Sequence, residues 1–332
     1  MNVLFIGGTG NISTWSSRLA VAKGIDLSLL TRGRRPADIP GAKIITADIN
    51  NKSQMATAIK GRRWDCVVNW VAFTPADIAR DIELFRDKCS QYIFISSASA
   101  YQKPPSHPVI TESTPLANPH WEYSRNKIAC EDALLQAYRE TGFPMTIVRP
   151  SLTYDMVIPL VVGGWEDYTI IDRMKRGKTV VTPGDGTSLW TVTHSEDFAK
   201  GFVGLLGHQQ AAGQAFHITS DELLTWDQIY QAAAAAVGVE AKIVHVPSDL
   251  MVRVNESLRG TLLGDKIHSV IFDNTKIKTF VPEFQAAIPF KTGIRRTIQW
   301  YQADPKRMVI VDGVNKMIDS ILDQYRKAFP DA

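Results

Sequence analysis

The chain has 332 residues, 45% of them hydrophobic, as in globular proteins whose length calls for more than one hydrophobic core. Its 37 basic and 34 acidic residues leave a net charge of +3, too small a surplus to indicate nucleic-acid binding by itself. No apolar run approaches the roughly 20 residues of a membrane span and no basic leader precedes the first strand, so we expect a cytoplasmic protein without a membrane partner.

The stretch Met1–Arg18 predicts a strand, a tight turn and a helix. Asn2–Ile6 is a short apolar run, and Gly7-Gly8-Thr9-Gly10 predicts the turn. Apolar residues then recur at helical spacing, at Ile12, Trp15, Leu19 and Ala22.

This turn suits the pyrophosphate of a dinucleotide. Glycines let backbone N–H groups approach an anion, and the N-terminus of the following helix carries partial positive charge. The dinucleotide fingerprint is matched through Gly8 and Gly10, but Ser13 stands where a third glycine is expected. An ordinary strand-to-helix turn is the alternative.

The second predicted strand, Asp26–Leu30, runs directly into Thr31-Arg32-Gly33-Arg34-Arg35. In a dinucleotide-binding sheet an acidic residue at this place binds the 2′-hydroxyl of the adenosine ribose, and here there is none. Arg32 suits a 2′-phosphate instead, which favours NADP over NAD. A solvated basic loop is the alternative.

Further strands alternate with helices along the chain. They are predicted at Lys43–Thr46, Asp65–Asn69, Gln91–Ser96, Leu189–His194, Ala215–Thr219 and Lys242–Val246. Because most are apolar nearly throughout and helices separate them, we expect a parallel sheet covered on both faces.

Side chains able to act in proton transfer follow the fifth strand. Ser97, Ser99 and Tyr101 lie at its carboxyl end, where an open sheet has its ligand crevice. Farther along, Tyr123 and Lys127 share one face of a long helix. An ammonium close to a phenol lowers the phenol's pKa from about 10, so we expect Tyr123 to act as acid or base and Ser97 to hold the substrate oxygen. A surface pair is the alternative for Tyr123 and Lys127 taken alone.

Together these features resemble an extended short-chain dehydrogenase/reductase, the branch that includes nucleotide-sugar epimerases and dehydratases. The resemblance runs from the N-terminus to about residue 220 and includes Gly7-x-x-Gly10, Asp48-Ile49, Asn69-Trp70-Val71-Ala72 and Arg149-Pro150. It implies cofactor contacts at Gly7, Thr9, Gly10, Asn11, Ile12, Arg32, Asp48, Ile49, Val71, Ala72, Lys127 and Pro150.

The same resemblance implies a catalytic set of Ser97, Tyr123 and Lys127. Tyr123 would exchange a proton with a substrate hydroxyl while the nicotinamide carbon exchanges a hydride, and Lys127 would also hold the nicotinamide ribose.

The substrate side departs from the nucleotide-sugar enzymes. There an arginine that grips the diphosphate follows a segment similar to Pro183–Gly186, whereas this sequence has Trp190. A neutral indole cannot neutralise a phosphate, so Trp190 either stacks on a ring or belongs to the core. The candidate substrate contacts are Ser99, Tyr101, Tyr154 and Trp190.

The expected fold class is α/β, a Rossmann-like doubly wound parallel sheet with a smaller C-terminal α+β substrate domain. The expected parts are a dinucleotide-binding domain at 1–150 with 187–220 returning to it, a substrate domain at 151–186 and 221–313, and a terminal helix at 314–330. Ser151–Pro159 is expected to be irregular and Lys103–Pro119 to be a flap over the site. The terminal helix would cap the core or pair with a second subunit in a homodimer.

The resulting hypothesis is an NAD(P)-dependent epimerase, dehydratase or reductase acting on a sugar-like secondary alcohol of a small-molecule substrate. One alternative is an RNA-binding protein that retains the fold, because Arg149–Tyr154 and Trp190–His194 also resemble chloroplast stem-loop RNA-binding relatives. Arg34-Arg35, Arg62-Arg63 and Arg295-Arg296 would then touch phosphates, but no aromatic residues are interleaved with them, so nucleic acid is not the expected partner.

The other alternative is a dinucleotide sensor without chemistry. The seven histidines lie far apart and the three cysteines follow no metal-ligand spacing, so we expect no metal site.

Overall fold

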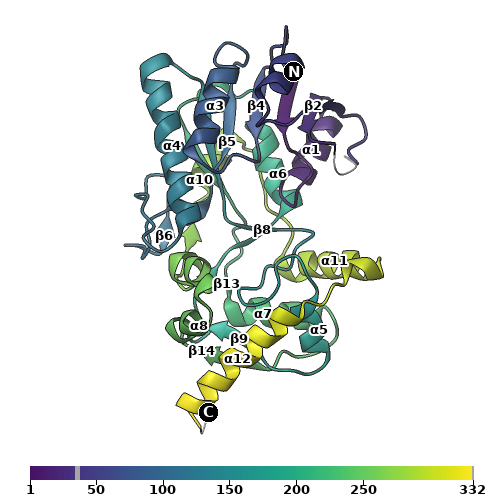
Figure 1. Ribbon diagram of the computed structural model, residues 1–332, viewed down its shortest axis with the longest axis vertical. Helices are drawn as coiled ribbons and strands as arrows, with labels where there is room; N and C mark the ends of the chain where they lie inside the picture. The colour runs from purple at the N-terminus through teal and green to yellow at the C-terminus, as the bar shows by residue number, and fades with distance from the viewer. Residues whose placement is uncertain (34–37, 331–332) are drawn as a thin grey trace.

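A seven-stranded parallel sheet forms one end of the molecule (Figure 1), in a computed structural model that describes residues 1–33 and 38–330. The sheet order is β12-β7-β5-β4-β1-β2-β3. Its strands are β1 (Asn2–Ile6), β2 (Asp26–Thr31), β3 (Lys43–Thr46), β4 (Cys66–Asn69), β5 (Tyr92–Ile95), β7 (Met145–Pro150) and β12 (Ala215–Ile218). The expected α/β class with a Rossmann-like parallel sheet is confirmed. Arg34 and Arg35 lie outside the described residues.

Helices cover both faces of this sheet because successive side chains of a strand point in opposite directions. Val3 and Phe5 of β1 share one buried cluster with residues of three helices, whereas Leu4 and Ile6 share another on the opposite face. The first face is covered by α1 (Ser13–Ala22), α6 (Ser195–Gly204) and α10 (Thr275–Phe280). The second is covered by α2 (Lys52–Ala58), α3 (Pro75–Phe85) and α4 (Glu122–Thr141).

Helix α1 buries a different face from the one that its apolar spacing predicts. Its buried residues are small: Ser13, Thr14, Ser16, Ser17 and Ala20. The larger Trp15 and Leu19 are only half-buried. The reason is close packing at the turn, where the Ser17 hydroxyl donates to the Gly8 carbonyl at 2.7 Å.

The other end of the molecule is built from short strands and helices (Figure 1). Here the structure corrects two expectations. Ser151–Pro159 is not wholly irregular, since β8 (Leu152–Tyr154) pairs with β11 (Val192–His194). The expected strand Leu189–His194 is split, because β10 (Leu189–Trp190) pairs with a different partner, β13 (Leu224–Thr225).

The remaining elements of this end surround a second buried core. They are α5 (Thr169–Lys175), β9 (Val180–Pro183), α7 (Trp226–Ala235), β14 (Ile243–Val246), α8 (Ser248–Val254), α9 (Arg259–Thr261), a π-helical turn (Leu262–Lys266), α11 (Phe290–Gln302) and α12 (Asp312–Ala328). Helix α12 buries Ile318, Ile321 and Leu322 against this core, so it acts as a cap. The domain boundaries and a homodimer stay predictions.

The connection Lys103–Pro119 is tied down more firmly than a free flap. It contains β6 (Val109–Ile110), which pairs with β15 (Ile271–Phe272). No helix in the described part of the chain is long and apolar enough to cross a bilayer.

A buried carboxylate fixes the loop after β4. Asp81 on α3 is fully buried and accepts hydrogen bonds from the Tyr92 hydroxyl at 2.6 Å and the Asn69 amide at 2.5 Å. The side-chain oxygen of Asn69 in turn accepts from the backbone N–H of Val71 at 2.8 Å. Burial raises the pKa of Asp81 because it disfavours the charged carboxylate. The donors of Tyr92 and Asn69 and the neighbouring Arg80 guanidinium oppose this rise by stabilising the charged form.

Replacing Asp81 by Ala should destabilise the fold because it leaves the buried donors of Tyr92 and Asn69 without an acceptor. We expect the free energy of unfolding to fall by about 3 kcal/mol, as for a buried pair that loses one partner. Urea unfolding measures this loss. The exposed Asp87 provides a matched control, since Asp87→Ala should change stability by less than about 0.5 kcal/mol. An equal effect of the two substitutions would contradict the prediction.

Candidate active site

The glycine turn after β1 packs closely against the loop that follows β4. Gly7 has φ +93°, and a Cβ there would lie 3.3 Å from the side chains of both Trp70 and Val71. Helix α1 begins after Ile12 without a side-chain cap. Among the described residues no N-cap side chain covers this helix end, although the Thr14 N–H donates to the Gly10 carbonyl at 3.0 Å. The partial positive charge of the helix N-terminus favours an anion there.

Ser13, which stands where a third glycine is expected, bonds to the backbone of the turn through its hydroxyl. Its hydroxyl accepts the Gly10 N–H at 2.9 Å and so takes one donor away from the turn. Asn11 is also engaged, since its amide donates to the Thr153 carbonyl at 2.9 Å and accepts from the Met156 N–H at 3.1 Å. The side chain of Asn11 thus joins the turn to β8 and to the residues that follow it.

The residues expected near the adenosine lie at the ends of β2 and β3. Arg32 is exposed. Asp48 is half-buried and its carboxylate accepts the Asn50 N–H at 3.0 Å, while Ile49 is buried. Thr9 is exposed at the turn.

The residues expected near the nicotinamide lie after β4 and at the end of β7. Val71 is 42% exposed, and Ala72 is buried. Pro150 is buried and pairs with Ile218 of β12. Next to it, the hydroxyl of Ser151 is buried without a hydrogen-bond partner among the described residues. Ser151 was missed from the sequence, although its place after Arg149-Pro150 was a usable signal.

A chain of hydroxyls holds Ser97. The Ser124 hydroxyl donates to the Ser99 hydroxyl at 2.7 Å, and the Ser99 and Ser97 hydroxyls are 2.8 Å apart. Ser97 is half-buried whereas Ser99 is buried. The Ser99 hydroxyl thus holds that of Ser97 in this structure, and its role as a substrate contact stays a prediction.

Tyr123 lies beside Ser97, and its acidity differs from the expectation. Burial raises the pKa of Tyr123, the interaction with the Ser97 hydroxyl opposes that rise, and the negative charge of Asp265 adds to it. The expected lowering by Lys127 is wrong, because desolvation of the phenol dominates.

Lys127 is held by backbone carbonyls. Its ammonium donates to the carbonyls of Ala72 at 2.7 Å and Ile95 at 2.8 Å, and lies 4.5 Å from the ring centre of Phe73. It lies 5.7 Å from the ring centre of Tyr123. Burial lowers the pKa of Lys127 to about 8. The ammonium thus joins α4 to the ends of β4 and β5.

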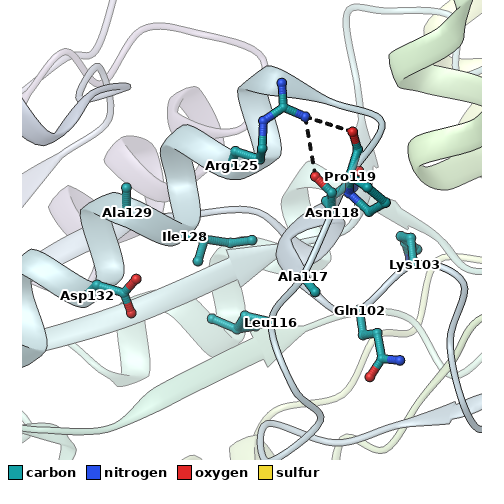
Figure 2. Close-up of a pocket in the computed structure, with 10 residues that line it drawn as sticks. All are labelled: Gln102, Lys103, Leu116, Ala117, Asn118, Pro119, Arg125, Ile128, Ala129 and Asp132. Carbon is teal, nitrogen blue, oxygen red and sulfur yellow. Dashed lines mark hydrogen bonds between the residues drawn. The ribbon is translucent and has the colours of Figure 1, made fainter.

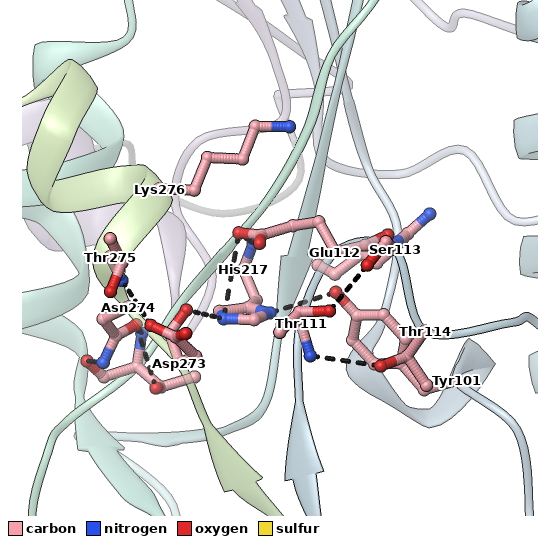
Figure 3. Close-up of polar contacts among 12 residues, drawn as sticks. Tyr101, Thr111, Glu112, Ser113, Thr114, His217, Asp273, Asn274, Thr275 and Lys276 are labelled. Carbon is pink, nitrogen blue, oxygen red and sulfur yellow. Dashed lines mark hydrogen bonds and ion pairs between the residues drawn. The ribbon is translucent and has the colours of Figure 1, made fainter.

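Three of the candidate substrate contacts are buried among protein atoms. Figure 3 shows Tyr101, whose hydroxyl is 3.0 Å from Nδ1 of His217, while Nε2 of His217 is 2.8 Å from the Asp273 carbonyl. A carbonyl only accepts, so Nε2 carries the proton and the Tyr101 hydroxyl donates to Nδ1. Trp190 and Tyr154 have at most 1% exposed surface. All three side chains pack inside the protein here, and their roles as substrate contacts stay predictions.

A cavity of about 680 Å³ borders α4 at residues other than Tyr123 and Lys127 (Figure 2). Arg125, Ile128 and Asp132 line it from this helix. Figure 2 shows the Arg125 guanidinium bonded to the carbonyls of Asn118 and Pro119, at 3.4 and 3.0 Å. Tyr123 and Lys127 are not among its lining residues, so this cavity is not the candidate active site. Among residues 1–33 and 38–330, no group of His, Cys, Asp and Glu is arranged to hold a metal ion.

Replacing Lys127 by Met should change how stability depends on pH. Burial holds the pKa of Lys127 at about 8, against 10.5 for an ordinary lysine. Between these values the unfolded wild-type chain binds a proton that the folded chain does not, so wild-type stability rises with pH. Relative to Lys127→Met, the free energy of unfolding should rise by about 3 kcal/mol across this interval. Urea unfolding of both proteins at several pH values measures it, and parallel profiles would contradict it.

Comparisons with known proteins identify the family of the chain. Residues 3–219 match the NAD dependent epimerase/dehydratase family. The chain is 30% identical over 260 residues to the chloroplast stem-loop binding protein of 41 kDa b of Arabidopsis thaliana, a match that covers 73% of this chain and 65% of the plant protein. It is 25% identical over 250 residues to 2′-dehydrokanamycin reductase of Streptomyces kanamyceticus, covering 75% of this chain and 70% of the reductase.

The fold is also found among solved structures. The dTDP-glucose 4,6-dehydratase of Bacillus anthracis, solved in complex with NAD, superposes with a TM-score of 0.71 at 19% identity, covering 92% of this chain and 98% of the dehydratase. The resemblance inferred from the glycine turn and the Tyr-x-x-x-Lys helix is confirmed: the chain belongs to the NAD dependent epimerase/dehydratase family of extended short-chain dehydrogenases/reductases.

Proposed function

We propose that this protein is an NAD(P)-dependent enzyme of the epimerase, dehydratase or reductase type that acts on a sugar-like secondary alcohol. The observation that carries the proposal is the meeting of Ser97, Tyr123 and Lys127 at the carboxyl edge of the sheet. A tyrosine and a lysine four residues apart often form an isolated pair on a helix surface. Here, however, the side chains of Tyr123 and Lys127 are largely buried. Perturbed pKa values of grouped side chains are typical of functional sites.

The residues at the glycine turn, after β4 and after β7 are suited to a dinucleotide. The N-terminus of α1, which no N-cap side chain of the described residues covers, would attract a pyrophosphate. The Ser151 hydroxyl, which has no hydrogen-bond partner among the described residues, follows Pro150, where the nicotinamide end is expected. The exposed Val71 would pack on the cofactor. When bound, the nicotinamide supplies a carbon that accepts or returns a hydride.

Tyr123 would move the proton. Because the pKa of the phenol is raised, Tyr123 carries its proton at neutral pH and is suited to protonate the oxygen of a carbonyl substrate during reduction. Oxidation of an alcohol needs the phenolate, so that direction should be favoured as pH rises. Ser97, held by Ser99, would keep the substrate oxygen close to the phenol.

Lys127 would position the cofactor rather than tune the phenol. Two of its three N–H donors are used by the carbonyls of Ala72 and Ile95, which leaves one for a ribose hydroxyl. The small-molecule class of substrate follows the relatives, among which 2′-dehydrokanamycin reductase is named for a carbonyl compound.

Replacing Tyr123 by Phe removes the proton donor but keeps the ring. Turnover should fall at least about 100-fold while dinucleotide affinity stays within about twofold. Turnover is measured as the change in nicotinamide absorbance with a panel of sugar-like secondary alcohols and their ketones. Tyr138→Phe is the matched control, since Tyr138 lies on the same helix and is 39% exposed. A Tyr123→Phe enzyme with wild-type turnover would rule out this mechanism.

For the cofactor we propose NADP rather than NAD, on the position of Arg32 at the end of β2. Mass spectrometry of the natively purified protein should find NADP, and Arg32→Glu should lower the affinity for NADP relative to NAD about tenfold or more. Arg86→Glu, an exposed arginine after α3, should leave that ratio unchanged. Co-purified NAD with an unchanged ratio in Arg32→Glu would contradict the preference.

A second candidate function is binding of an RNA stem-loop, which the similarity to the plant stem-loop binding protein favours. The arginine pair Arg62-Arg63 is exposed, and Arg295-Arg296 is exposed with Arg296 paired to Glu196 at 2.9 Å. Binding through these pairs would weaken steeply with added salt. RNA affinity that is insensitive to salt would exclude a phosphate-driven mode.

A further inference from the structure

One carboxylate and two ammonium groups form a cluster that the proposed reaction does not use. Asp265 accepts a hydrogen bond from the Lys266 ammonium at 2.6 Å, and its other oxygen lies 3.3 Å from the Lys103 ammonium. Lys103 and Asp265 are buried, with 1% and 8% of their side chains exposed. Lys266 keeps 15% of its side chain exposed, so the cluster has one accessible edge.

This cluster borders the candidate active site. Asp265 and Lys266 belong to the π-helical turn Leu262–Lys266. The Asn118 amide ties this turn to the hydroxyl chain, because it donates both to the Ser99 carbonyl at 2.9 Å and to the Gly264 carbonyl at 2.7 Å. The charge of the carboxylate also acts on the phenol of Tyr123.

Two tryptophans fix the position of Lys266. Its carbonyl accepts the indole N–H of Trp190 at 2.9 Å and of Trp226 at 2.8 Å. Its ammonium lies 4.2 Å from the ring centre of Trp190, a favourable cation–π distance. The ammonium is therefore preorganised, so little side-chain entropy is lost when a ligand binds it.

The cluster of Lys103, Lys266 and Asp265 has one more positive charge than negative charge. Two ammonium groups share one carboxylate, and the pKa of the nearby His268 is lowered by burial, so that imidazole is neutral at neutral pH. An excess positive charge withdrawn from water is costly unless an anion pairs with it.

We propose that Lys266 and Lys103 form an anion-binding subsite beside Tyr123, so the substrate carries a carboxylate or a phosphate close to its reacting hydroxyl. The proposal rests on the proposed function, because it places the anion on the substrate of that site. Lys266 makes the direct contact through its accessible edge, and Lys103 supports it from behind the shared carboxylate.

Two matched pairs of probes test this subsite and distinguish the two anions. The first pair is 3-hydroxybutyrate and its neutral amide; the second is glycerol 3-phosphate and glycerol. With dinucleotide bound, ligand-observed NMR titration should show that the anionic member of at least one pair binds about tenfold or more tightly than its neutral partner. Lys266→Met keeps the aliphatic stem on Trp190 and should remove that preference.

Two further variants separate the role of charge from folding. Lys266→Arg should retain the preference, and Lys278→Met should leave it unchanged, because Lys278 pairs with Asp221 on the surface at 2.8 Å. If Lys266→Met does not fold, the preference of the wild-type protein should still shrink as NaCl is added. Equal affinities within both pairs, no binding of any probe, or a preference that survives in Lys266→Met would overturn the subsite while dinucleotide binding persists. Failure to bind a dinucleotide would instead overturn the proposed function itself, and this inference with it.

Discussion

The arrangement of the candidate site depends on one buried ammonium. Lys127 joins α4 to the ends of β4 and β5 through the carbonyls of Ala72 and Ile95, and the rings of Phe73 and Phe94 lie within 5 Å of its charge. Burying a lysine is costly, which is why its pKa falls to about 8, and the two carbonyls and the ring faces offset part of that cost. Because Tyr123 lies one helical turn before Lys127, the same contacts fix where the phenol meets the strands.

A second network of buried polar side chains holds the elements around the end of β5 together. The Ser96 hydroxyl donates to Glu131 at 2.5 Å, and Glu131 pairs with Arg149 at 2.5 Å in a fully buried ion pair. The guanidinium lies 4.8 Å from the ring centre of Tyr101, whose hydroxyl is bonded to His217 (Figure 3). The network therefore connects the end of β5 with α4, β7 and β12, and it buries the Tyr101 hydroxyl.

How much of this was predictable from the sequence depends on the range of the interaction. The strands, the glycine turn and the Tyr-x-x-x-Lys face are local patterns, and the structure has elements where these patterns predict them. The burial of Trp190 and the pairing of β8 depend on partners far along the chain, so no local pattern signals them. The ion pair of Lys103 with Asp265 spans 162 residues, and the acidity of Tyr123 is set mainly by desolvation, a property of the packed molecule. The buried face of helix α1 was predicted wrongly for another reason. Its small residues, and not its large apolar ones, are buried.

The cost of these buried groups bears on the choice between an enzyme and a binding module. A protein that only displays surface arginines to a phosphate backbone gains nothing from a desolvated lysine, an unpartnered Ser151 hydroxyl or a phenol with a raised pKa. The desolvated lysine and the unpartnered hydroxyl lower the stability of the empty protein at neutral pH, and groups of this kind are typical of places that bind or react. If Lys266 and Lys103 bind an anion as proposed, a protonated phenol near the carboxylate of Asp265 would suit one direction of chemistry, because the phenol would give its proton to a carbonyl oxygen while the ammonium groups hold an anionic neighbour in place. The same pair of features would disfavour a substrate that brings a second cation to the cleft, because it would meet Lys266 without a free carboxylate to pair with.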